Sequence, residues 1–392
     1  MNDVRGLRIA HLIESDGPGG AEHVVAQLAT AFQAAGAWNV AFLPAEGEGW
    51  LARQLEGSGV TVEYLRLDRP LSPGYARSLE HALRRHRVAV AHSHEFTMAV
   101  YGAWAARRAG IPHVITMHGG PYYAARLRRR VALRTAIAVS ARTVAVSLPL
   151  ARHLSRNLWI RPSRILTIPN GVRHVRPEQV TLRDELALRP ADRLLVSVGN
   201  LYPVKGHLHL VDALARLAER HPQLHLAIAG RGELEGALAT RARDHGLQGR
   251  VHLLGLRSDI PALLAAADVF VLPSLSEGLP LALLEAMFAG CPIVASDVGE
   301  VGVALAGGRA GVLVEPGHPE ALATAIEGLL NDPNRARALA ESAGRRAAAE
   351  YDVAQMSRRY LETYHQVLRP RGDSHRVRGE NDTALDLSQA SE

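Results

Sequence analysis

The chain has 392 residues, of which 47% are hydrophobic and 21% are charged, and this composition excludes wholesale disorder. At roughly 150 residues per domain, the length suggests two domains. The most apolar stretch, Ile260 to Leu275, contains Asp268 and Pro273, so we expect no membrane-spanning helix. The apolar run before Glu14 is short, and we expect no secretory signal. Cys291 is the only cysteine, which excludes internal disulfide bonds, fits a cytoplasmic protein and indicates a small core residue.

Charge is divided unevenly along the chain. Residues 1–175 carry a net charge of +11, whereas residues 176–392 carry −5. This asymmetry indicates an anionic partner for the first half. Arginine supplies 44 of the basic residues and Lys205 is the only lysine. A retained lysine suggests a site that needs a compact ammonium group, although chance would also explain one lysine.

Apolar strand-like runs alternate with segments of helical period along most of the chain. We expect a first series of strands at residues 7–13, 40–43, 61–65, 88–92, 113–117 and 143–147. A second series is expected at 194–199, 224–229, 251–254, 269–272, 293–295 and 311–314. Near-continuous apolar strands that alternate with helices predict parallel sheets covered on both faces. The two series therefore predict two doubly wound, Rossmann-like α/β domains.

The domain boundaries follow from breaks in this pattern. We assign residues 1–175 to the first domain and 176–350 to the second, because prolines and Asn170-Gly171 interrupt the periodicity between them. Residues 351–369 read as a final helix. Residues 370–392 are polar with few apolar anchors, and we expect a disordered tail.

The segment SLSEGLPLALLE at 274–285 follows a predicted strand. Pro280 suits the first turn of a helix, which would leave Glu277 in the preceding loop and Glu285 about one turn inside the helix. Free N–H groups near Gly278–Leu281 would then form an anion site at the carboxyl end of the strand. Carboxylates beside such a site suit sugar or ribose hydroxyls. The alternative is that Glu277 caps the helix and Glu285 is solvated.

Two further turns of the second half contain glycine. The first, GNLYPVKG at 199–206, joins a strand to a helix and places Lys205 where a phosphate could be held, although a plain turn remains the alternative. The second, Gly230-Arg231-Gly232, lacks the spacing and the following acidic residue of a dinucleotide site, so we predict no NAD binding.

In the first half, glycines at 17–20 open a helix and would let the backbone approach a ligand closely. His118 ends a predicted strand and would point into the crevice at the sheet edge, although a lone histidine is more often structural. His92, His94, His113 and His118 match no zinc-site spacing and no cysteine assists them, so we predict no metal site. The chain also lacks an Asp-x-Asp carboxylate pair.

A basic helix with an aromatic flank is expected after residue 125. Tyr122 and Tyr123 precede it, and Leu127, Val131 and Leu133 would supply apolar contacts. Its arginines would face an anionic membrane surface or the phosphate of a lipid acceptor, or simply solvent. They are Arg126, Arg128, Arg129, Arg130 and Arg134.

Together these segments resemble the retaining glycosyltransferases of family 4, which have the GT-B fold. The resemblance covers about residues 7–365. In the second half it rests on the E-x7-E pair Glu277 and Glu285, and on VGNLYPVKG at 198–206, GxG at 230–232, VHLLG at 251–255, ADVFVLPS at 267–274, AGCPIVASDVG at 289–299 and GVLVEPG at 311–317. In the first half it rests on GPGGAE at 17–22, TMHGG at 116–120 and IPNGV at 168–172.

The resemblance implies two Rossmann-like domains that face a central cleft, with the helix at 351–369 returning to the first domain. A nucleotide-sugar would lie in the cleft, with Lys205 on the diphosphate, Glu285 on the ribose, and Glu277 and His118 on the transferred sugar. Glu277, His118 and Lys205 are therefore the expected catalytic residues. Further donor contacts are expected from Gly19, Gly20, Asn200, Arg231, Gly278, Leu279, Pro280 and Leu281.

Asn200 departs from the family pattern, because many relatives carry an arginine there. Diphosphate binding would then depend more on Lys205, on helix N-termini or on Arg231. We expect a retaining, metal-independent hexosyltransferase without a cofactor or nucleic-acid partner. It would use a nucleotide-sugar, with UDP-sugars favoured, and a glycan or lipid-linked acceptor, in the cytoplasm or at the inner face of the membrane. The alternatives are a GT-B nucleotide-sugar epimerase and a non-catalytic nucleotide-sugar-binding protein.

Overall fold

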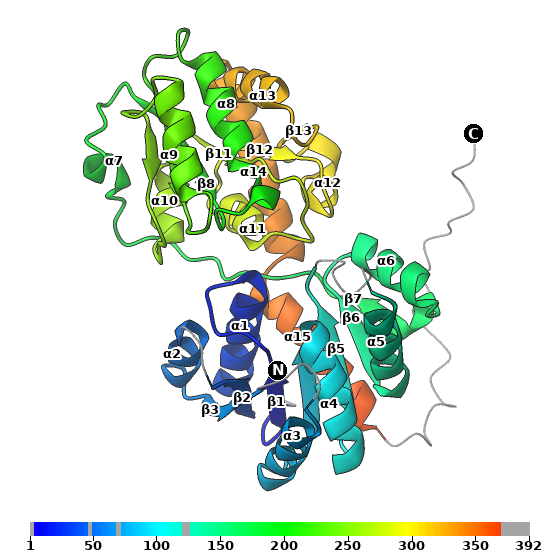
Figure 1. The fold of residues 1–392 in the computed structure, drawn as a ribbon. Helices are drawn as coiled ribbons and strands as arrows, with labels where there is room; N and C mark the ends of the chain where they lie inside the picture. Colours follow the sequence, from blue (N-terminus) through cyan, green and yellow to red (C-terminus); the bar gives the residue numbers. More distant parts are fainter. Residues whose placement is uncertain (1–3, 46–48, 68–71, 120–125, 370–392) are drawn as a thin grey trace.

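A computed structural model describes residues 4–45, 49–67, 72–119 and 126–369. The expected disordered tail at 370–392 lies outside the described residues, as do Tyr122 and Tyr123. The chain forms two α/β domains, each built on a parallel sheet (Figure 1). The expected fold class, two Rossmann-like domains that face a cleft, is thereby confirmed.

The first domain contains a seven-stranded sheet in the order β3-β2-β1-β4-β5-β6-β7. Its strands are β1 (Arg8–Leu12), β2 (Trp38–Pro44), β3 (Thr61–Leu65), β4 (Val90–His94), β5 (His113–Met117), β6 (Arg142–Ala145) and β7 (Ile165–Thr167). The helices are α1 (Gly20–Ala34), α2 (Trp50–Glu56), α3 (Pro73–Arg85), α4 (Glu95–Ala109), α5 (Leu127–Val139) and α6 (Leu148–Leu158).

The second domain contains a six-stranded sheet in the order β10-β9-β8-β11-β12-β13. Its strands are β8 (Arg193–Val198), β9 (Leu224–Ala229), β10 (Val251–Leu253), β11 (Val269–Leu272), β12 (Ile293–Ser296) and β13 (Val312–Val314). The helices are α7 (Leu182–Glu185), α8 (His207–Leu217), α9 (Glu235–Asp244), α10 (Ile260–Ala266), α11 (Leu281–Phe288), α12 (Val301–Ala304), α13 (Pro319–Asn331) and α14 (Pro333–Glu350), and α15 (Val353–Leu368) follows.

All the expected strands are present within two residues of their predicted bounds, and two strands need comment. The strand expected at 88–92 is β4, which lies two residues later, at Val90–His94. Its last two polar residues are buried because Ser93 binds His113 and His94 binds His118. The edge strand β7 was not predicted, because its three residues are too few for a periodic pattern and only Ile165 is buried.

The strand order places one switch point in each sheet. In the first sheet β1 lies between β2 and β4, and in the second β8 lies between β9 and β11. At these points the connecting helices leave toward opposite faces, so a crevice opens at the carboxyl ends of the two central strands. The segments that carry the predicted donor residues follow these strands.

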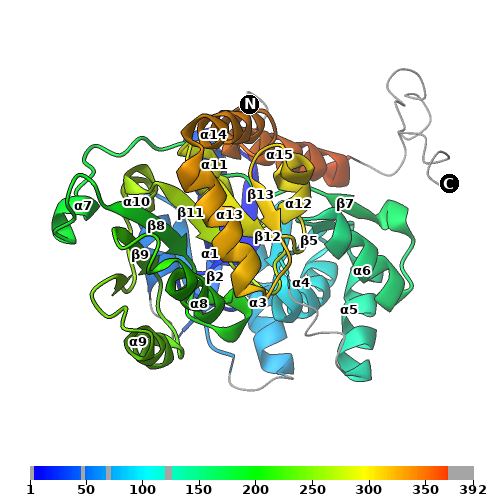
Figure 2. The same ribbon diagram turned by 90° about the horizontal axis from the view of Figure 1, so that it is seen from above.

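The C-terminal helix α15 packs against the first domain. Tyr360 and Tyr364 are fully buried, in one apolar cluster with Phe32 of α1 and Val114 of β5. The hydroxyl of Tyr364 lies 2.7 Å from Nδ1 of His92. In the view from above, α14 leads into α15, which lies along one edge of the molecule (Figure 2).

The two crossings between the domains lie side by side. Val172, on the first crossing, donates its N–H to Tyr351 O at 2.9 Å, and its own carbonyl accepts from the N–H of Val353 at 3.1 Å. A Cβ on Gly171 would lie 2.8 Å from Asp352 O, so the two segments touch where only glycine fits. The two crossings are therefore hydrogen-bonded to each other where they pass between the domains.

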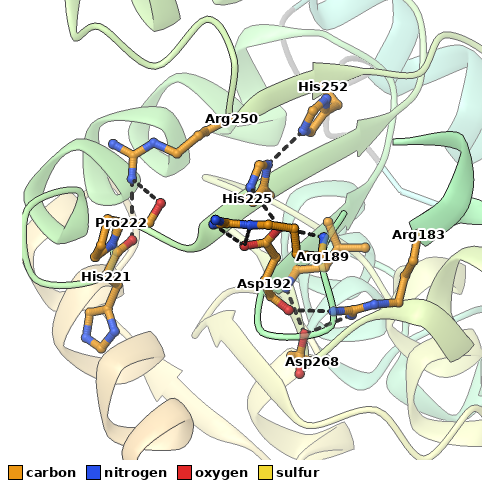
Figure 3. A network of polar contacts seen from close by, with 10 residues as sticks. Arg183, Arg189, Asp192, His221, Pro222, His225, Arg250, His252 and Asp268 are labelled. Carbon is orange, nitrogen blue, oxygen red and sulfur yellow. Dashed lines mark hydrogen bonds and ion pairs between the residues drawn. The ribbon is translucent and has the colours of Figure 1, made fainter. Parts of the chain in front are cut away.

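A polar network joins α7 and the segment after it to the start of the second sheet (Figure 3). Arg183 binds Asp268 at 3.2 Å, and Arg189 binds Asp192 at 2.9 Å. These two arginine pairs meet at the amino-terminal ends of the strands, because Asp268 also accepts the N–H of Leu194 at the start of β8. The network therefore stabilises the edge of the sheet opposite the crevice.

Candidate functional site

The crevices of the two domains join in one cleft of about 1000 Å³. Its walls include eleven of the twelve residues expected to contact the donor: Gly19, Gly20, His118, Asn200, Lys205, Glu277, Gly278, Leu279, Pro280, Leu281 and Glu285. The structure thus brings residues from both halves of the chain together. The twelfth, Arg231, is not among the described residues that line this cleft.

Lys205 and Glu277 form an ion pair across the switch point of the second sheet. Nζ of Lys205 donates to Oε1 of Glu277 at 2.7 Å, and the same oxygen accepts a hydrogen bond from Oγ of Ser274 at 2.7 Å. The Glu277 side chain is 8% exposed and that of Lys205 27% exposed. The ammonium group is therefore held at the cleft by a carboxylate that an anionic ligand would displace or share.

Close backbone packing shapes the turn that carries Lys205. Gly206 has a φ of 68°, and a Cβ there would collide with the carbonyl of Pro273. A Cβ on Gly230 would collide with the carbonyl of Gly199 in the same way. The Gly-x-Gly segment thus supports the lysine turn, and Arg231 contributes its carbonyl to the N–H of Leu201 at 2.9 Å while the residue itself is exposed.

The loop before α11 also packs closely against neighbouring backbone. A Cβ on Gly299 would collide with the carbonyl of Glu277, and one on Gly278 would lie 2.9 Å from the carbonyl of His118. Pro280 was expected in the first helical turn, but its extended ψ of 130° makes it the residue before the helix. The missing N–H of proline is not needed at either position, which is why the sequence did not distinguish them.

Glu285 lies about one turn inside α11 and lines the cleft. Burial raises the pKa of its carboxyl group from 4.5 to about 7. A ligand that donates hydroxyl hydrogen bonds would favour the ionised form. Glu285 is therefore suited to bind such groups.

His118 lies at the carboxyl end of β5, where its Nε2 is 2.9 Å from Nδ1 of His94. Burial lowers the pKa of His118 to about 3. The ring is therefore neutral at physiological pH and faces the cleft as an uncharged hydrogen-bonding group.

The sequence did not predict that His11, His92 and His94 form a buried imidazole cluster, with ligating atoms within 4.8 Å of one another. His92 engages both ring nitrogens, with Thr116 Oγ1 and Tyr364 OH, each at 2.7 Å. Of the six ring nitrogens in this cluster, Nδ1 of His11 and Nε2 of His94 lack a partner within the described part of the chain. The cluster connects His118 through His94 and His92 to α15.

Glu95 is a cleft residue that the sequence reasoning missed. It is the first residue of α4, with a left-handed φ of 64°, and its Oε1 accepts the N–H of His118 at 2.9 Å. Burial raises its pKa to about 7. Its position directly after the strand end at His94 was the available signal, since ligand sites form at such ends.

The domains also contact each other directly beside the cleft. Asn170 Nδ2 donates to the carbonyl of Leu279 at 3.0 Å. Glu300 Oε1 accepts the N–H of Leu148, at the start of α6, at 2.6 Å. Because each contact links the first domain to a segment near the Glu277 loop, domain movement would change the geometry of the site.

The expected basic helix is α5, and Arg126 is the residue before its first turn. Arg126, Arg128 and Arg134 are exposed, whereas Arg129 and Arg130 are half-buried. The guanidinium groups of Arg130 and Arg134 lie over the Trp159 ring, at 5.1 and 5.9 Å from its centroid. Leu127 is 70% exposed and Val131 55%, while Leu133 is in the core.

Among the described helices, none combines the length and apolar character needed to cross a membrane.

Two family models match most of the chain. Residues 18–176 match the model described as Glycosyltransferase Family 4, and residues 178–346 match Glycosyl transferases group 1.

Similar proteins carry related names. The UDP-Gal:alpha-D-GlcNAc-diphosphoundecaprenol alpha-1,3-galactosyltransferase of Escherichia coli is 33% identical, over 56% of this chain and 61% of the relative. The D-inositol 3-phosphate glycosyltransferase of Segniliparus rotundus is 30% identical, over 72% of this chain and 67% of the relative. The chain spans less than two thirds of the first of these relatives.

Solved structures share the fold. Anabaena Alr3699/HepE in complex with UDP-glucose superposes with a TM-score of 0.81 at 25% identity, covering 92% of this chain and all of the other (100%). WaaG, a glycosyltransferase involved in lipopolysaccharide biosynthesis, has a TM-score of 0.71 at 18% identity, covering 91% of this chain and 99% of the other.

Replacing Gly206 by alanine should destabilise the protein much more than replacing Gly290. Both glycines have a φ near 67°, but a Cβ on Gly290 meets open space whereas one on Gly206 meets the Pro273 carbonyl. We expect a loss of about 1 kcal/mol for Gly290→Ala and about 1–3 kcal/mol more for Gly206→Ala. Thermal unfolding followed by circular dichroism measures both, and equal losses would contradict the packing described for this turn.

Glu285→Gln should stabilise the protein at alkaline but not at acidic pH. Because the pKa of Glu285 is raised from 4.5 to about 7 in the folded state, the stability of the wild type falls as the pH rises through that interval. Glutamine does not ionise, so the variant does not lose stability in this way. At about pH 8 it should be more stable than the wild type by up to about 3 kcal/mol. Urea unfolding at the two ends of the interval tests this. The exposed Glu341→Gln is the control and should show no such pH-dependent gain.

Proposed function

This chain belongs to the GT-B glycosyltransferases of family 4, and from that premise we propose that it transfers a hexose from a UDP-sugar to a saccharide hydroxyl with retention of configuration. The observation that carries the proposal is the Lys205–Glu277 pair at the switch point of the second sheet, with Glu285 and His118 lining the same cleft. A cation suits the diphosphate of a nucleotide-sugar, and carboxylates and a neutral imidazole suit its hydroxyl groups.

Each group has a part in holding the donor. The Lys205 ammonium binds the diphosphate once it exchanges its contact with Glu277, and N–H groups at the start of α11 add to this site. Glu285 accepts the ribose hydroxyls, and Glu277 accepts a hydroxyl of the transferred sugar. UDP is favoured because the similar Anabaena protein was crystallised with UDP-glucose.

Asn200 carries no charge, so the charge of the diphosphate must be balanced by cationic side chains elsewhere in the cleft. Arg257 lines the cleft but is bound to Asp259 at 2.6 Å and to Glu185 at 2.9 Å. Arg173, on the crossing between the domains, also lines the cleft. Lys205 and Arg173 are therefore the cations that we propose for the diphosphate.

Transfer breaks the bond between C1 of the sugar and the diphosphate oxygen and forms a bond from the acceptor oxygen to C1. The acceptor attacks the face from which the diphosphate departs, and its proton passes to the leaving phosphate. Fixed cationic and N–H groups stabilise the charge that develops on the diphosphate. These groups, together with the absence of an Asp-x-Asp pair from the sequence, favour a reaction that needs no metal.

The neutral His118 cannot act as a general acid near pH 7, because its pKa is about 3. It binds the donor sugar, and Glu95 positions it by holding its backbone N–H. The epimerase alternative is not favoured, since the similar proteins are named as transferases.

We propose a lipid-linked saccharide as the acceptor, at the cytoplasmic face of a membrane. The E. coli relative is named for a substrate on diphosphoundecaprenol. In this chain the exposed Leu127 and Val131 lie among the exposed arginines of α5, a combination that suits an anionic membrane surface.

Lys205→Ala and Glu277→Gln should each lower kcat/KM for transfer from a UDP-hexose by about 100-fold or more, because each removes a group that holds the reacting part of the donor. The assay measures UDP release with and without acceptor. Arg220→Ala is the control, since it breaks only the surface pair with Glu327. Full activity in both site variants would refute the site, and inhibition of the wild type by EDTA would refute metal independence.

Substituting alanine for Arg126, Arg128 and Arg134 together should weaken binding to phosphatidylglycerol vesicles by about 100-fold, at about 1 kcal/mol for each charge. The matched control removes Arg335, Arg337 and Arg345, three exposed arginines of α14. Vesicle sedimentation measures both triple variants. Equal losses in both would mean that net charge, and not the surface of α5, determines binding.

A further inference from the structure

The first-domain wall of the cleft extends along α1 and onto α2, and the mechanism above uses none of its side chains. It is lined by His23, Gln27 and Thr30 from α1, by Trp50 and Gln54 from α2, and by Ser58. These six residues, here called the α1–α2 groove, belong to the same cleft as Lys205 and Glu277.

Two aromatic rings form the floor of the α1–α2 groove. The ring centroids of His23 and Trp50 lie 4.3 Å apart, with the planes inclined by 37°. Nδ1 of His23 lies 2.8 Å from the carbonyl of Gly19, which can only accept, so Nδ1 carries the proton and Nε2 is left as an acceptor. Burial lowers the pKa of His23, which keeps the ring uncharged.

Asp16 fixes the aromatic floor relative to the glycine loop. Its carbonyl accepts the N–H of Trp50 at 3.1 Å, and its Oδ1 accepts the N–H of Ala52 at 2.9 Å. Leu51 and Leu55 anchor the other side of α2 in the core. Because Gly19 and Gly20 follow Asp16 by a few residues, Trp50 is rigidly placed beside the loop expected to approach the donor.

The polar groups of the α1–α2 groove are neutral. Gln27 lies one turn from His23, and its buried Oε1 has no partner within the described part of the chain. Gln54 adds a second amide, while Thr30 and Ser58 add hydroxyls. Between residues 4 and 119, the described residues that line the cleft include no arginine or lysine, and their acids are Glu22 and Glu95.

From these observations we infer that the α1–α2 groove binds a neutral pyranose ring of the acceptor and discriminates against a phosphorylated one. This inference rests on the proposed glycosyltransferase function. An aromatic face buries the apolar C–H face of a sugar, and amides and hydroxyls pair with its hydroxyl groups. A phosphate would find no cationic side chain among the six groove residues, so its desolvation would not be compensated there.

A relative of this chain is named for a phosphorylated substrate, which the uncharged groove residues of this chain would not favour. The Segniliparus rotundus protein is named for D-inositol 3-phosphate, an acceptor that carries a phosphate. In this chain, whose first half is rich in arginine, the acceptor wall has no cationic side chain among its described residues.

Saturation-transfer NMR on the full-length protein tests the inference without requiring turnover. The probes are the methyl glycosides of glucose, galactose and N-acetylglucosamine, with myo-inositol 3-phosphate as the charged comparison. We expect saturation of glycoside C–H protons in the wild type, retention in Trp50→Phe, and loss of about tenfold in affinity in Trp50→Ala. Trp104→Ala, which alters a partly exposed tryptophan outside the cleft lining, should behave as the wild type.

A second variant, Gln54→Arg, changes charge at an exposed position and so carries little risk of unfolding. It should weaken glycoside binding and strengthen binding of inositol phosphate. Three results would overturn the inference: equal glycoside saturation in Trp50→Ala, preference of the wild type for inositol phosphate, or no glycoside saturation in a protein that binds UDP-glucose.

Binding of UDP-glucose, followed by thermal shift, separates this inference from the proposed function. If no UDP-hexose shifts the wild type or releases UDP, the proposed function fails. If the donor binds normally to Trp50→Ala while glycoside saturation persists, only the α1–α2 groove assignment fails.

Discussion

The site depends on the ion pair between Lys205 and Glu277, which lie on loops that follow two neighbouring strands. Two strands that are distant in sequence, β8 and β11, are neighbours in a parallel sheet, so the loops that follow them must share one edge. Glycines at 206, 230 and 299 lie where a side chain would collide with backbone, and they allow these loops to pack. The ammonium nitrogen and the carboxylate oxygen consequently lie 2.7 Å apart.

Burial prepares the remaining groups of the cleft electrostatically. It lowers the pKa of His118 to about 3 and raises those of Glu95 and Glu285 to about 7. Near neutral pH the cleft thus holds an uncharged imidazole and two carboxyl groups that change protonation easily. A polar ligand that replaces lost solvation would stabilise the ionised carboxylates, which couples ligand binding to proton release.

The two domains are mechanically linked through few elements. The crossings meet at Val172, and α15 returns the chain to the first domain, where Tyr364 reaches His92. His92 lies in the imidazole cluster that contacts His118 through His94. The C-terminal helix is therefore part of the support of a cleft residue, although it lies far from the cleft in sequence.

The sequence by itself determined the fold class and most of the second-domain residues that line the cleft. Apolar periodicity located nearly all strands, and Lys205, Glu277 and Glu285 stood out because their positions relative to strand ends are local properties. Only the tertiary structure decided that the Arg231 carbonyl supports the lysine turn and that Glu95 binds the N–H of His118. It also decided that the rings of Trp50 and His23 form the floor of the α1–α2 groove. Those outcomes depend on packing between distant segments, which local spacing does not encode.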